Sequence, residues 1–278
     1  MRGSTPAPGA EFLRYGGNTS CVALTHDTAS APTLVLDAGT GLARLARHLD
    51  GEPFRGSILL GHMHWDHTHG LPFFPAGDNP GGEVDLYIPL QGDETGERLL
   101  ERAVSPPHFP ITPAQLRGRW RFLDLDAGDF EIEDFSVMVR DIPHPGGRTM
   151  GFRVSDGRAT IAYLSDHWPI SLGKGPDGFG EYHESALELV GGVDVLIHDS
   201  QYTADEFAER WMFGHSSIDY AVGLARRAKA NRLVLFHHDP PRTDDQLDAI
   251  VAALRDSDGD VHVTAAAEGM TLELPPAP

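Results

Sequence analysis

The sequence predicts an α/β fold in which mixed β-sheets are covered by helices on the outside. Short runs rich in Val, Ile and Leu recur along the chain, and each is closed by Gly, Asp or His. Such runs are typical of buried strands. Helical patterns lie between the later runs only, and strands followed by strand–helix alternation indicate mixed sheets with outer helices.

The individual elements can be placed from these patterns. We expect strands at 33–36, 57–60, 136–139, 160–164, 193–197 and 232–236. We expect helices at about 183–191, 204–211, 216–229 and 244–256. Ser216, Ser217 and Asp219 open the third of these helices with residue types that favour an N-cap.

The length of 278 residues favours one domain spanning residues 1–278. The segment from about 72 to 120 differs in composition, because it is rich in Pro, Gly and charged residues. We expect it to be a variable loop insertion, and a loop of that length inside a compact domain is usually functional.

Composition limits the classes of partner and the compartment. The chain has 41 acidic and 22 basic side chains, a net charge of −19 and no block of Lys or Arg. This argues against nucleic acid as a partner, although a local cationic pocket stays compatible with it. Cys21 is the only cysteine, so an intrachain disulfide is impossible. No apolar run approaches the roughly 18 residues of a membrane span, and we expect a cytoplasmic protein that does not bind membranes.

The densest group of metal-binding residue types comes directly after the strand expected at 57–60. His62 and His64 alternate along an extended stretch, while Asp66 and His67 continue into the following turn. Three imidazoles and one carboxylate within six residues suit a borderline metal such as Zn²⁺. The alternative is a solvated polar turn, which rarely carries four good ligands at this spacing.

Further candidate ligands follow later strands in order. His144 ends the run Asp141-Ile142-Pro143, Asp166 follows the strand at 160–164, and His237 and His238 follow the strand at 232–236. Each alone is more often structural. Together with the first group they supply the ligand count of a dinuclear centre.

The motif His62-x-His64-x-Asp66-His67, followed by these residues in the same order, resembles the HxHxDH signature of the metallo-β-lactamase superfamily. The resemblance implies an αββα sandwich of two mixed β-sheets and two divalent metal ions, Zn²⁺ first, with Mn²⁺ or Fe as alternatives. It assigns His62, His64 and His144 to one metal and Asp66, His67 and His237 to the other, with Asp166 as the bridge. The register favours His237 over its neighbour His238. Asp37 would orient ligands from below, or else be a turn residue.

A second block narrows the resemblance to one branch. Gly214-His215-Ser216-Ser217, after His198-Asp199, is similar to motifs of tRNase Z and related phosphodiesterases. The resemblance implies that His215 is a general acid, oriented by Asp199, and that Asp66 belongs to the catalytic set as well as to the ligands. The alternative for His215 is a neighbour of the helix cap.

Departures from the family define the expected substrate. Only 22 positions separate His144 from Asp166, which leaves no room for the tRNA-gripping insertion of tRNase Z. Only 41 residues follow His237, too few for the C-terminal domain of glyoxalase-type thioesterases. We therefore expect a dinuclear hydrolase that cleaves small, in some cases cyclic, phosphodiesters with a metal-activated hydroxide. A lactonase or phosphotriesterase on the same centre, and a metal-stabilised binding or regulatory protein, are the alternatives. The expected partner is a small-molecule substrate, and a homodimer is left open.

Overall fold

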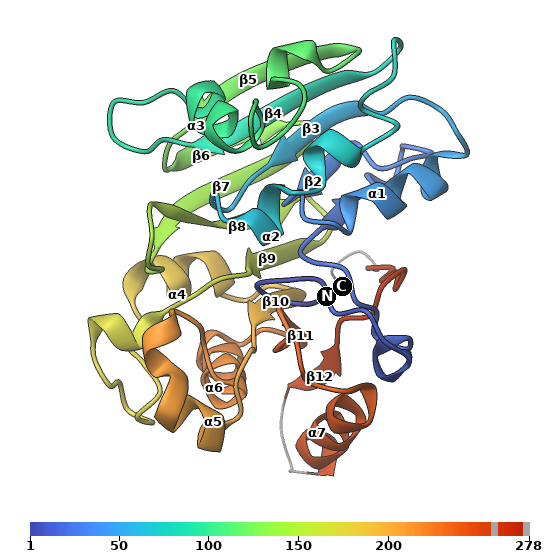
Figure 1. Cartoon of the computed structure of the whole chain (residues 1–278). Coiled ribbons are helices and arrows are strands. Elements are labelled where there is room, and N and C mark those ends of the chain that lie inside the picture. The colour runs from blue at the N-terminus through green and yellow to red at the C-terminus, as the bar shows by residue number, and fades with distance from the viewer. Residues whose placement is uncertain (257–260, 275–278) are drawn as a thin grey trace.

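The computed structural model describes residues 1–256 and 261–274 and arranges them as two β-sheets between outer helices (Figure 1). The first sheet has five strands in the order β1 (Val22–Leu24), β2 (Leu34–Leu36), β3 (Arg55–Leu59), β4 (Glu83–Pro89) and β5 (Arg119–Leu125). The second has seven in the order β12 (His262–Ala265), β11 (Arg232–Phe236), β10 (Val195–Asp199), β9 (Thr160–Leu164), β8 (Thr149–Ser155), β7 (Phe135–Ile142) and β6 (Gly128–Ile132).

Helices cover the outer face of each sheet (Figure 1). On the side of the first sheet lie α1 (Leu42–Leu45) and α3 (Gly96–Ala103), whereas the short α2 (Trp65–Thr68), which carries Asp66 and His67, follows β3. On the side of the second lie α4 (Glu184–Val190), α5 (Ala204–Arg210), α6 (Ile218–Ala228) and α7 (Asp244–Asp256). Short 3₁₀ helices are η1 (Ala10–Phe12), η2 (Ala46–Leu49), η3 (Leu71–Phe73), η4 (Pro113–Gln115), η5 (Pro169–Leu172) and η6 (Trp211–Phe213). The predicted αββα sandwich is confirmed.

Three apolar layers hold the sandwich together. Leu36 and Leu59 of the first sheet pack with Tyr163 and Phe236 of the second in the layer between the sheets. A second layer joins the outer face of the second sheet to α4, α6 and α7, and a third joins the first sheet to α1 and α3. Burying a Leu or Phe side chain stabilises the fold by roughly 1.5–3 kcal/mol, which explains why the strands read as almost continuous apolar runs.

The six predicted strands and four predicted helices all lie where the patterns indicated, within a few residues. Ser217 is the N-cap of α6, and its hydroxyl accepts a hydrogen bond from the backbone N–H of Tyr220. The segment 72–120 is not loop throughout, because it contains β4 and α3 and begins β5. β4 alternates half-buried and buried side chains, and its polar residues hide the strand from a search for continuous apolar runs.

Strand direction brings the later candidate ligands to one edge of the second sheet. β9, β10 and β11 run parallel to one another, and β7 runs the same way because β8 is antiparallel to both β7 and β9. The carboxyl ends of these four strands therefore meet at one edge, and His144, Asp166, Asp199 and His237 end or follow them.

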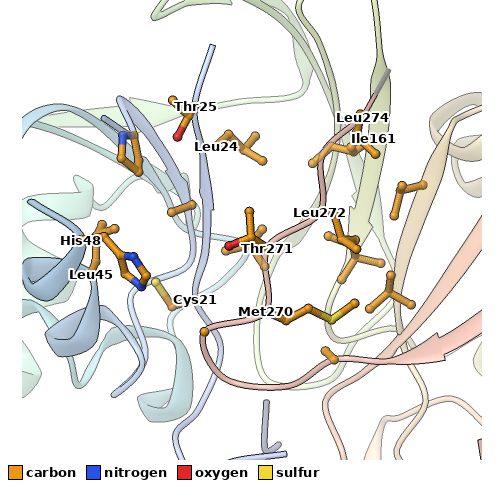
Figure 2. Close-up of a pocket in the computed structure, with 18 of the residues that line it drawn as sticks. Cys21, Leu24, Thr25, Leu45, His48, Ile161, Met270, Thr271, Leu272 and Leu274 are labelled. Carbon is orange, nitrogen blue, oxygen red and sulfur yellow. The ribbon is translucent and has the colours of Figure 1, made fainter. Parts of the chain in front are cut away.

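A groove opens between the sheets beside β1 and the segment 266–274, with a volume of about 1210 Å³ (Figure 2). Its wall includes Leu24, Ile161, Leu272 and Cys21, and burial raises the pKa of the Cys21 thiol to about 12. None of the candidate metal ligands lines it, so the chemistry lies elsewhere. Within residues 1–256 and 261–274, no helix is long and apolar enough to cross a bilayer.

Candidate active site

Seven side chains predicted as metal ligands meet in two adjoining clusters. Within each cluster, one donor atom from every residue lies within 4.8 Å of the others. The first cluster consists of His62, His64, His144 and Asp166. The second consists of Asp66, His67, Asp166 and His237. The division is the one that the family resemblance implied.

Asp166 belongs to both clusters and presents one oxygen to each. Its Oδ2 lies 3.5 Å from His62 Nε2 and 3.4 Å from His144 Nε2. Its Oδ1 lies 3.0 Å from His67 Nε2 and 3.1 Å from His237 Nε2. A carboxylate at the end of β9, fully enclosed between two sets of imidazoles, has the arrangement of a bridging ligand.

The polar atoms of the clusters fit divalent cations. Both ring nitrogens of His62, His67 Nε2 and Asp166 Oδ1 are buried and have no hydrogen-bond partner among the described residues. Such orphans are rare in folded proteins unless they bind something. Within the described ranges, the ion pairs of Asp66 and Asp166 are with histidines and not with Lys or Arg. Imidazole and carboxylate donors around an excess of negative charge suit Zn²⁺ or a similar ion.

A hydrogen bond outside the clusters fixes which nitrogen of His67 faces inward. His67 Nδ1–H donates to Asp37 Oδ2 at 2.7 Å, so His67 Nε2 presents its lone pair to the second cluster. Asp37 follows β2 with a φ of 61° and also accepts from the hydroxyls of Tyr163 at 2.7 Å and Ser165 at 3.1 Å. Its Oδ1 accepts from the backbone N–H of Gly61 at 2.7 Å. Asp37 therefore supports ligands from below, as the sequence suggested.

The structure brings His237, and not His238, to the clusters. His237 Nδ1–H donates to Gln201 Oε1 at 2.9 Å and its Nε2 lies 3.1 Å from Asp66 Oδ2. Its backbone φ of 56° turns the chain after β11, so that the next side chain, His238, points away and donates through Nε2 to the carbonyl of Ala266 at 3.0 Å. Gln201 was missed in the sequence, because nothing local to it signals a partner 36 positions away.

The N-terminal segment closes the second cluster from the other side. The backbone N–H of Ser4 donates to Asp66 Oδ2 at 2.7 Å. A Cβ at Gly3 would lie 2.3 Å from His237 Nδ1, so only glycine fits there without displacing the ligand. This contact, too, had no signal in the sequence.

His144 is held by the block that contains His215. Its Nδ1–H donates to the carbonyl of Gly214 at 2.8 Å, which leaves Nε2 facing His64 Nδ1 at 3.2 Å. Burial lowers the pKa of His144 to about 4, against the opposing charge of Asp166. His144 is therefore neutral at pH 7, the state that a ligand needs.

His215 lies beside both clusters and is paired with Asp199. Its Nδ1 lies 3.1 Å from Asp199 Oδ2 and 3.9 Å from Asp166 Oδ2, and its ring stacks on His237 at 4.9 Å. Burial alone would lower the pKa of His215, but the charge and hydrogen bond of Asp199, together with the charges of Asp166 and Asp66, outweigh burial and raise that pKa to about 9. Cations bound in the clusters would repel the imidazolium and bring the pKa back toward neutrality.

Asp199 is held rigidly, at the end of β10. Its Oδ2 accepts from the backbone N–H groups of His167 at 3.1 Å and Ser216 at 3.2 Å, and its Oδ1 accepts from Gln201 N–H at 3.1 Å. A carboxylate that accepts this many hydrogen bonds is held in one orientation. The predicted pair is thus brought together next to the candidate metal ligands.

Behind Asp199 lies a chain of three histidines that sequence reasoning did not connect. His167 Nδ1 lies 3.0 Å from His198 Nε2, and His167 Nε2 lies 2.8 Å from His183 Nε2. Burial lowers the pKa of all three, for His183 to about 4. His183 is the half-buried end of this neutral chain and the N-cap of α4.

The chain is similar to known proteins in sequence and in fold. Ribonuclease Z from Anoxybacillus flavithermus is 26% identical over 262 residues, which cover 80% of this chain and 81% of the relative. The metallo-beta-lactamase fold protein YhfI from Bacillus subtilis superposes with a TM-score of 0.68 at 18% identity. The superposition covers 97% of this chain and 94% of YhfI. A diphosphatase from the PhnP family superposes with a TM-score of 0.64 at 17% identity, covering 93% of this chain and 86% of its own.

Family and site agree on the class of chemistry. The model of the beta-lactamase superfamily domain matches residues 33–238, a range that contains every candidate ligand as well as His215 and Asp199. Two adjoining cation sites beside a protonated imidazole can polarise a bond for attack by water and protonate the group that leaves. The chain therefore belongs to the beta-lactamase superfamily, as one of its metal-dependent hydrolases.

Proposed function

We propose that this protein is a dinuclear phosphodiesterase that acts on small phosphodiesters, cyclic ones included. The observation that carries the proposal is the His215–Asp199 pair beside the two clusters. An alkoxide leaves a phosphodiester poorly without a proton, whereas a lactone or an activated ester needs a proton donor less. The ribonuclease similarity supports a phosphodiester bond, and the diphosphatase similarity supports hydrolysis at phosphorus more generally.

In this proposal His62, His64 and His144 would hold one ion, Asp66, His67 and His237 would hold the second, and Asp166 would be shared by the two sites. We propose Zn²⁺ as the native ion, with Mn²⁺ or Fe as alternatives. Bound ions would supply Lewis-acid charge that lowers the pKa of nearby water and offsets charge on the phosphoryl oxygens.

The protein's own groups would direct the proton. His215 donates through Nδ1 to Asp199, which leaves Nε2–H of the imidazolium to protonate the leaving oxygen. Asp199 acts by holding the ring in that orientation. Asp66 combines its role as ligand with orientation of the second cluster, since it accepts from Ser4 N–H and faces His237.

We propose a small-molecule substrate rather than tRNA. The residues between His144 and Asp166 are occupied by β8, β9 and the turn between them, with no inserted arm. The net charge of −19 also disfavours a polyanion. The similarity to ribonuclease Z, at 26% identity, favours a nucleic-acid substrate instead. We further propose a single domain over residues 1–278 and a cytoplasmic protein, with a homodimer left open.

A hydrolysis panel on metal-loaded protein tests the proposal. It should include bis-p-nitrophenyl phosphate, cyclic nucleotides, lactones and phosphotriesters. We expect turnover of the diesters in preference to the others. Faster hydrolysis of lactones or triesters would replace this function with the second candidate, a lactonase or phosphotriesterase on the same centre.

A further inference from the structure

Several exposed apolar side chains, most of them aromatic, lie close in the chain to candidate site residues. Trp65 is 68% exposed and Phe213 is 61% exposed, and Phe73, Trp211 and Met212 are exposed as well. Water-exposed apolar groups that gather in one region mark a binding site more often than a structural need. Neither the metal clusters nor the proton donor uses these side chains.

One aromatic wall is built on α2. Trp65 stands between two candidate ligands, His64 and Asp66, so its Cα is fixed by the metal centre itself. Its indole ring stacks on the imidazole of His69 at 5.6 Å with an interplanar angle of 13°. One face of the indole is therefore covered by His69, and the exposure of the side chain leaves the other face accessible to a ligand.

The second wall surrounds the block that carries His215. Trp168, two residues after Asp166, stacks on Trp211 at 6.5 Å and 18°, and its indole N–H donates to the carbonyl of Trp211 at 2.6 Å. Phe213 lies two residues before His215. Gly214 allows this turn to pack closely against Pro145, since a Cβ at Gly214 would lie 2.4 Å from the Pro145 ring.

We propose that these two walls bind a planar aromatic or heteroaromatic group carried by the substrate, next to the phosphoryl group at the metal clusters. The inference rests on the proposed function and narrows its substrate class. Flat rings are attracted to flat rings by dispersion and by their quadrupoles, in offset or edge-on arrangements. Arg210, close to the second wall in the chain, is already paired with Asp239, so recognition here relies on stacking and not on charge.

The kinetic test compares two diesters with the same leaving group. Bis-p-nitrophenyl phosphate and ethyl p-nitrophenyl phosphate both release p-nitrophenolate and differ in the group that stays on phosphorus. We expect Trp65→Leu and Phe213→Leu to reduce the aryl-to-ethyl ratio of kcat/KM by roughly 5–10-fold, the size of one aromatic contact. The intrinsic reactivities of the two diesters cancel between variants. Leu13→Ala removes an exposed apolar side chain outside both walls and should leave the ratio unchanged.

A binding test separates this inference from the proposed function. On metal-loaded protein, calorimetry should give tighter binding of phenylphosphonate than of methylphosphonate, by roughly tenfold, and Trp65→Leu should remove the difference. If neither diester is hydrolysed but this preference persists, the proposed function fails and the planar-group site stands. Equal affinities in the wild type, no measurable binding of phenylphosphonate, or a preference unaffected by both wall variants would overturn the inference.

Discussion

Replacing His215 by alanine separates proton donation from metal binding. The side chain belongs to neither of the two main ligand clusters, so His215→Ala should retain both ions. We expect a loss of roughly 10²–10⁴-fold in rate on a diester whose leaving group is an alkoxide, the usual contribution of a positioned general acid. The loss should shrink to less than about tenfold for p-nitrophenolate, which leaves without a proton.

The structure also gives a magnitude for the charges around the proton donor. Although burial opposes the imidazolium, Asp199 at 3.1 Å, with the charges of Asp166 and Asp66, raises the pKa of His215 from 6.5 to about 9, a net stabilisation of roughly 3 kcal/mol. In Asp199→Asn the share that Asp199 contributes is lost and the pKa of His215 falls. We expect a loss of roughly 10–100-fold at pH 7.5 on the alkoxide diester, smaller than in His215→Ala. Since the acid acts only when protonated, the wild-type rate on this diester should fall as pH rises through the pKa of His215.

The assay measures kcat for a cyclic nucleotide and for bis-p-nitrophenyl phosphate, together with metal content, in each variant. His262→Ala removes an exposed histidine on β12 and serves as the control. The ratio of the two losses in His215→Ala is the deciding quantity. Equal losses on both leaving groups at unchanged metal content would refute proton donation and reduce His215 to a structural role.

Three further results are expected. Asp166→Ala should lose both ions by elemental analysis, whereas His64→Ala should retain at least the second ion, because Asp166 is the residue that belongs to both clusters. A single ion per wild-type chain after loading would contradict a dinuclear centre. The folded protein should lose stability as pH falls from about 6.5 to 4, because burial depresses the pKa of His183 to about 4 and keeps it neutral in the fold. His183→Gln should remove part of that loss, on the order of 1–2 kcal/mol after allowance for partial exposure, and an unchanged acid limb in thermal melts would count against this account. No stable tRNA complex is expected, so micromolar binding that weakens steeply with salt would show that the acidic surface was misread.

The candidate ligands could be recognised in the sequence because their pattern is local. Each ligand follows an apolar strand within a few residues, and the carboxyl ends of parallel strands meet at one edge whatever the details of the turns. The spacing of His62, His64, Asp66 and His67 depends only on one strand end and one helical turn. β4 was not predicted because polar residues alternate with apolar ones along the strand, and because the residues around it are rich in Pro and Gly.

The sequence by itself determined the mixed sheets with outer helices and the seven candidate ligands, because strand pattern and motif spacing are short-range properties. Its resemblance to the metallo-β-lactamase superfamily added the αββα sandwich and the His215–Asp199 pair. Only the tertiary structure decided which atoms hold those residues in place. Gln201 accepts a hydrogen bond from His237, the hydroxyl of Tyr163 donates to Asp37, and the backbone N–H of Ser4 donates to Asp66. The partners in these pairs are 36 to 126 positions apart in the chain. Such partners are set by how two sheets pack and by single backbone angles such as the positive φ of His237, and neither quantity is encoded in any local pattern of residues.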